Sequence, residues 1–91
     1  MPDEQMIDVD FGADWGGTVS VVARSTTLHA IAGPAEAYEF LCRRWPGARG
    51  TAFAKARRTA MAALCGKSSV DEAKATFIAA CVQADCLART E

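Results

Sequence analysis

The chain has 91 residues, of which 51% are hydrophobic, and a formal net charge of −1. This length predicts one domain with one modest core. The sequence excludes a membrane-spanning helix, because no apolar run approaches the roughly 20 residues that such a helix needs. The first residues are acidic and lack the basic start and apolar run of a secretory signal. We therefore expect a cytoplasmic protein with no membrane contact.

The first 16 residues differ from the rest of the chain. Residues 1–16 carry five acids and no base, and they show no sustained periodicity. Such a composition is typical of a flexible segment. We therefore interpret residues 1–16 as an acidic, flexible lead-in, with Trp15 outside the predicted elements. Residues 17–91 are then a single small α+β domain.

Two stretches rich in β-branched and apolar residues follow the lead-in. Residues 18–23 and 27–32 predict two strands, and the three residues between them predict a short turn. An isolated hairpin is marginally stable in water, so helices must cover it. A two-stranded sheet also has exposed edges, and pairing between two copies would cover one of them. We therefore expect a homodimer.

Proline and glycine residues punctuate the next part of the chain. Gly33-Pro34 predicts the start of a first helix, and Pro46 predicts its end. Thr51 is predicted to cap a second helix that runs to about Cys65 and stops at Gly66.

A third helix follows. Ser69 and Glu72 are spaced as a capping box, which predicts a helix running to about Ala84. For residues 86–89 two interpretations stay open, a short strand or a frayed end. The predicted fold class is α+β, an N-terminal β-hairpin covered by three α-helices in the order ββααα.

Within this helical block the sequence resembles the bacterial family of domain of unknown function 982. The resemblance rests on these motifs: Trp45-Pro46, Gly50, Ala56, Ala63-Leu64-x-Gly66 and Ala73-Lys74-x-x-Phe77-Ile78-x-Ala80. It covers roughly residues 18–87 and implies a small bacterial cytoplasmic domain, with no activity attached. Lys74 stands where the family pattern suggests arginine, and Ala60 where many members carry cysteine. Gln83-Ala84-Asp85 replaces a Glu-Ala-Gly ending.

The cysteines and the single histidine offer little sign of chemistry. Cys42, Cys65, Cys81 and Cys86 form no CxxC pair, and helical surroundings predict buried, reduced thiols. A zinc site would have to recruit these scattered residues together with His29. We therefore predict no metal and no cofactor. His29 is expected at the rim of the sheet, with Ser20 across the hairpin from it.

The strongest feature is a basic stretch without acids between residues 40 and 70. Its candidate surface residues are Arg43, Arg44, Arg49, Lys55, Arg57 and Arg58. A solvated helix face is the simplest interpretation. An acidic protein partner or nucleic acid would also select such a cluster.

Together these features favour a small non-catalytic interaction or regulatory module. Two alternatives stay open at this point. One is a nucleic-acid-binding accessory protein that uses the same basic residues. The other is a small enzyme or redox protein with a Cys/His centre, which requires His29 and one cysteine to meet in a pocket.

Overall fold

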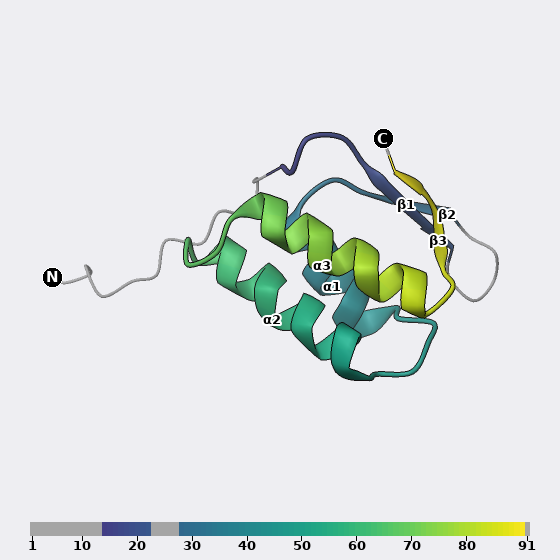
Figure 1. The fold of residues 1–91 in the computed structure, drawn as a ribbon. Coiled ribbons are helices and arrows are strands. Elements are labelled where there is room, and N and C mark those ends of the chain that lie inside the picture. Colours follow the sequence, from purple (N-terminus) through teal and green to yellow (C-terminus); the bar gives the residue numbers. More distant parts are fainter. Residues whose placement is uncertain (1–13, 23–27, 91) are drawn as a thin grey trace, which may run out of the picture.

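A computed structural model describes residues 14–22 and 28–90 of the chain. Its elements in chain order are β1 (Val19–Val22), β2 (Leu28–Ile31), α1 (Pro34–Arg43), α2 (Thr51–Leu64), α3 (Val70–Gln83) and β3 (Leu87–Thr90). All three helices lie on one side of the sheet, and α2 packs against both α1 and α3 (Figure 1). The predicted α+β class is confirmed. The predicted turn and most of the predicted lead-in lie outside the described residues.

The sheet has one strand more than the predicted hairpin. Its order is β2-β1-β3, and β1 is antiparallel to both neighbours. The chain end whose state the sequence left open is therefore a strand. The register places Val21 opposite His29 and Ser20 opposite Ala30. The expectation that Ser20 lies across from His29 is wrong, because successive residues of a strand point to opposite faces.

The ends of α2 follow local backbone chemistry, with one correction. The N-cap is Gly50, in extended conformation at φ −93° and ψ −156°, and no side chain caps the helix. Thr51, the predicted cap, is already the first helical residue. Gly66 ends the helix at φ +76°, as predicted. The N–H groups of Gly66 and Lys67 donate to the carbonyls of Ala63 and Ala62, the pattern of a Schellman motif.

The start of α3 confirms half of the predicted capping box. The Ser69 hydroxyl accepts a hydrogen bond from the Glu72 N–H at 3.0 Å. The Glu72 carboxylate accepts from the Ser68 hydroxyl, also at 3.0 Å, where the prediction had it reach back to the cap residue. The serine side chain therefore satisfies an N–H group at the helix start that would otherwise lack a partner.

Aromatic rings form the centre of the core. The ring of Phe77 lies 5.6 Å from Trp15, 6.2 Å from Phe40 and 6.5 Å from Trp45, measured between centroids. Trp15 is 4% exposed, and its Nε1 donates to the Ile31 carbonyl at 3.2 Å. Trp15 comes from the end of the stretch interpreted as a lead-in, so the packed domain includes it.

Candidate functional site

A groove of about 560 Å³ runs between α1 and α2. Its lining is mostly apolar, with carboxylates and an arginine among it: Ala35, Glu36, Tyr38, Glu39, Cys42, Arg43, Met61 and Leu64. Met61 leaves 38% of its surface exposed. A concave apolar surface with an exposed large side chain is typical of a place where a partner binds.

A second hollow, of about 300 Å³, adjoins this groove. It shares Tyr38 and Met61 with the groove and adds Ala54, Arg57 and Arg58. Both arginines are exposed in the second turn of α2, and no ion pair among the described residues neutralises them. The apolar groove therefore has a positively charged end.

Tyr38 lies where the groove and the second hollow meet. A hydrogen bond with the Cys42 thiol is the main cause that raises the pKa of the Tyr38 hydroxyl above 10.0, while the charge of Arg57 lowers it in part. The phenol therefore stays neutral at physiological pH. A neutral phenol offers a partner both a hydrogen-bond donor and an apolar ring.

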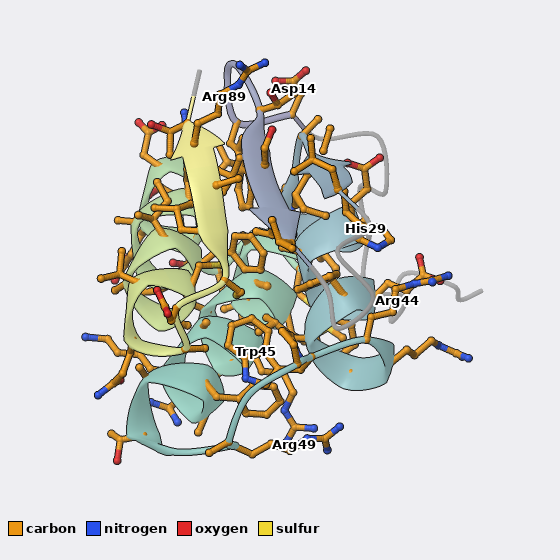
Figure 2. The ribbon with its side chains drawn as sticks, turned by 90° about the vertical axis from the view of Figure 1, so that its right-hand side faces the viewer. Asp14, His29, Arg44, Trp45, Arg49 and Arg89 are labelled. Carbon is orange, nitrogen blue, oxygen red and sulfur yellow. The ribbon has the colours of Figure 1, made fainter. Side chains whose placement is uncertain are left out.

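Arg49 belongs to the predicted basic cluster, but local contacts occupy it. It lies in the loop between α1 and α2, at the lower end of the molecule in Figure 2. Its Nη2 donates to the Cys42 carbonyl at 3.4 Å, and its guanidinium carbon lies 5.2 Å from the centre of the Phe53 ring. Arg49 therefore holds the loop against the two helices and is less available to a partner.

Two further residues of the predicted cluster lie away from the groove. Arg44 is on the β2 side of α1, where Figure 2 shows it beside His29. Lys55 precedes Arg58 by three residues of α2, yet it lines neither the groove nor the second hollow. The structure thus brings only three of the six predicted basic residues to the groove: Arg43, Arg57 and Arg58.

His29 lines a third hollow, of about 270 Å³ between β2 and α1, which shares Glu36 and Glu39 with the groove. Its ring lies 5.5 Å from that of Phe40, and Glu36, Glu39 and Arg44 also line the hollow. None of the four cysteines does. The Cys/His centre considered from the sequence requires a shared pocket, and this hollow does not supply one.

The cysteines fall into two pairs by exposure. Cys81 and Cys86 are 0% and 5% exposed, whereas Cys42 and Cys65 are half-buried. Burial is the main cause that raises the pKa of both Cys81 and Cys86 thiols. Buried neutral thiols are poor nucleophiles, because the reactive species is the thiolate.

Sequence reasoning found the arginines of this site but missed its apolar part. No motif in the sequence marks Tyr38 or Met61 as part of a site. A signal was present, since Met61 follows Arg57 by four residues and so lies one turn further along the same helix face. The sequence does not fix which side of α2 packs against α1, so the spacing of Arg57 and Met61 alone does not identify the groove.

The described part of the chain lacks both a metal cluster and a membrane-spanning helix. No group of three or more His, Cys, Asp or Glu side chains there is placed to hold a metal ion. Nor is any described helix both long and apolar enough to cross a membrane.

Comparison with known proteins adds a family and no activity. Searches of the curated proteins and of the solved structures gave no match. The family model described as "Protein of unknown function (DUF982)" matches residues 18–88, which include every described strand and helix except the end of β3. A match over this share of the chain shows that the protein belongs to the DUF982 family.

Proposed function

We propose that this protein is a small non-catalytic interaction or regulatory module of the cytoplasm, and that it binds an apolar, acidic segment of a protein partner between α1 and α2. The observation that carries the proposal is the mostly apolar groove beside Arg43, Arg57 and Arg58. Burial of apolar surface supplies affinity, and exposed arginines favour carboxylates on the partner.

The residue types at the groove support this role. Tyrosine, methionine and arginine are enriched in protein interfaces relative to other surface. Tyr38, Met61 and Arg57 lie together where the groove and the second hollow meet. Their side chains combine apolar area with directional hydrogen bonding, so a small patch is able to hold most of the binding energy.

Nucleic-acid binding by the same arginines is less favoured. A phosphate backbone selects basic side chains gathered on one face, whereas Arg44 and Lys55 lie away from the groove. Glu36 and Glu39 also line the groove, and they repel a phosphate backbone, which carries negative charge along its whole length. The nuclease arm of the test below distinguishes nucleic acid from a protein partner.

The test is capture of binding partners by tagged full-length protein from the lysate of its source organism, with and without nuclease. Wild type is compared with the double variant Arg57→Glu, Arg58→Glu, which reverses the positive end of the groove. Lys55→Glu, Lys67→Glu is the matched control, because it makes the same charge change at exposed positions outside the groove lining.

We expect a protein that remains bound after nuclease, is lost with the arginine variant and is retained with the lysine control. Its binding segment should carry apolar residues and carboxylates. Equal capture by wild type and the arginine variant would overturn the proposal. Loss of all bound material after nuclease treatment would replace it with nucleic-acid binding.

We also propose that two copies pair through β2. Among the described residues β2 pairs only with β1, and its sequence, Leu28-His29-Ala30-Ile31, carries no proline and no Lys, Arg, Asp or Glu. The other edge strand, β3, carries Arg89 and meets β1 at an irregularity between Ser20 and Val21. Charges and bulges discourage edge pairing, so β2 is the edge left open to a second chain.

Light scattering at increasing protein concentration tests this pairing. We expect a dimer mass for wild type and a monomer mass for Ala30→Lys, which adds a charge at an exposed position of β2. A monomer mass for wild type at every concentration would rule the pairing out. A dimer that persists in Ala30→Lys would place the interface elsewhere.

A further inference from the structure

The groove between α1 and α2 has opposite charges at its two ends. The two helices run antiparallel, so one end is formed by Ala35 and Glu36 from the first turn of α1 together with Leu64, the last residue of α2. The other end holds Arg43, the last residue of α1, and on α2 Arg57 lies seven residues before Leu64, so both arginines are displaced toward this end. Glu36 precedes Arg43 by seven residues, which is about 10 Å along a helix axis.

These charges are largely available to a ligand. One Glu36 oxygen accepts the Ala32 N–H at 2.7 Å, and Glu39 has no bonding partner among the described residues. Glu39 and Arg43 are four residues apart on α1, yet the structure shows no ion pair between them. Within the part of the chain that the structure describes, neither the negative end nor the positive end has an ion-pair partner.

The groove walls favour a helix as the occupant. Both walls are α-helices, whose backbone N–H and C=O groups are bonded within each helix except in the first and last turns. The groove thus offers side chains and no row of backbone groups, so a partner must satisfy its own backbone. An amphipathic helix does so and presents apolar residues at i, i+3 or i+4, and i+7.

We propose that the groove selects a bipolar amphipathic helix, with basic side chains over Glu36 and Glu39, apolar anchors over Met61, and carboxylates over Arg43 and Arg57. This inference rests on the proposed function. It narrows the partner from an acidic segment to a helix that carries bases at one end and acids at the other. The ten residues of α1 span about 15 Å, so three turns of partner helix cover the groove.

Three synthetic peptides of about 14 residues test the inference. All carry the same leucine anchors. The first has bases at one end and acids at the other, the second has the same charges interspersed, and the third has acids only. Binding to full-length protein is measured by fluorescence anisotropy, for wild type and for Glu39→Lys. Glu39 is exposed, so the variant should fold normally, which its thermal unfolding curve checks.

For wild type we expect the bipolar peptide to bind about tenfold more tightly than either of the others. Glu39→Lys should reverse the order and make the all-acid peptide the tightest. If the all-acid peptide binds wild type best, or if Glu39→Lys leaves the order unchanged, the bipolar partner is wrong while the groove remains a binding site. If no peptide binds, the helical partner is wrong, and the capture experiment above separately decides whether the groove binds a partner at all.

Discussion

Asp85 has the one left-handed backbone among the non-glycine residues that the structure describes, at φ +59°. It ends α3 through the same pair of hydrogen bonds that ends α2. The Asp85 and Cys86 N–H groups donate to the Val82 and Cys81 carbonyls at 3.1 and 3.0 Å. Gly66 holds the equivalent position after α2. The family pattern suggests glycine at residue 85 too, and the left-handed conformation gives a physical reason for that choice.

We expect Asp85→Gly to raise the free energy of unfolding by about 0.5–1 kcal/mol, because glycine removes the strain of a side chain at positive φ. Urea unfolding measures the change. Gly66→Ala is the control of opposite sign and should cost about 1–2 kcal/mol, since its added Cβ meets open space and only the backbone conformation is penalised. If Asp85→Gly lowers the free energy of unfolding, the Asp85 carboxylate stabilises the fold by more than the backbone strain destabilises it.

The buried thiols predict how stability depends on pH. The folded-state pKa of Cys81 is raised above its usual 9.0, mainly because the side chain is buried, and the nearby Cys86 adds to the effect. A raised pKa means that the unfolded chain loses this proton first as the pH rises. The stability contributed by the neutral thiol is therefore fully present below pH 9.0 and decreases above it, by up to about 1.4 kcal/mol per pH unit.

Cys81→Ala removes this pH dependence. At neutral pH we expect the variant to be less stable than wild type by about 1 kcal/mol, because it loses a buried sulfur. This difference in unfolding free energy between wild type and variant should shrink as the pH rises from neutral to about 10.5. Urea unfolding at a series of pH values measures it. Ile31→Val is the control, since it also removes buried volume but adds or removes no ionisable group. A Cys81→Ala deficit that stays constant with pH would contradict this assignment.

At the scale of elements, the loop between α1 and α2 packs tightly against the end of α3. A Cβ added at Gly47 would lie 2.9 Å from the Ala84 Cβ, closer than two such carbons approach. The contact involves a short side chain fixed to the backbone, so it has little freedom to move. The absence of a side chain at Gly47 thus determines how closely this loop approaches α3.

Gly47→Ala should cost about 1–3 kcal/mol of unfolding free energy, the usual range for forced overpacking. In a background that already carries Ala84→Gly the same change should cost about 1 kcal/mol less, because the opposing Cβ is gone. A double-mutant cycle by urea unfolding measures this coupling. Gly50→Ser serves as a control at an open position, with an expected change within about 0.5 kcal/mol. Additive costs at Gly47 and Ala84 would show that the two do not meet.

At the scale of the whole molecule, residues far apart in sequence join the start of the described chain to the helices. The backbone N–H of Trp15 donates to the Ala32 carbonyl at 3.0 Å, and the Trp15 ring packs on Phe77. The Lys74 ammonium donates to the Gly16 carbonyl at 2.9 Å, across 58 residues of sequence. The segment before β1 is therefore part of the packed structure from residue 14 onwards.

Trp15→Ala should lower the unfolding free energy by about 3–5 kcal/mol, since it removes a large side chain from the core. Trp15→Phe keeps an aromatic ring beside Phe77 but loses the hydrogen bond to the Ile31 carbonyl, so a smaller loss of about 1–2 kcal/mol is expected. Chemical denaturation followed by circular dichroism measures both variants. A loss below about 0.5 kcal/mol for Trp15→Ala would mean that this residue does not anchor the segment.

Local sequence signals were enough to predict the elements whose ends depend on neighbouring residues. Pro34 begins α1, Gly66 ends α2 and Ser69 caps α3, because proline geometry, left-handed glycine and a side-chain cap each act within a few residues. The family motifs lie in the same helical block. The arginines of the groove were also found, since their charge is visible without a structure.

Which of these residues meet depends on the tertiary structure. It paired β3 with β1, buried Trp15, left Arg44 and Lys55 out of the lining of the groove, and left all four cysteines out of the hollow that His29 lines. Each of these outcomes depends on how elements distant in sequence pack, and helical or strand periodicity fixes a residue's face without fixing which neighbour covers that face. The apolar groove between α1 and α2 exists for the same reason.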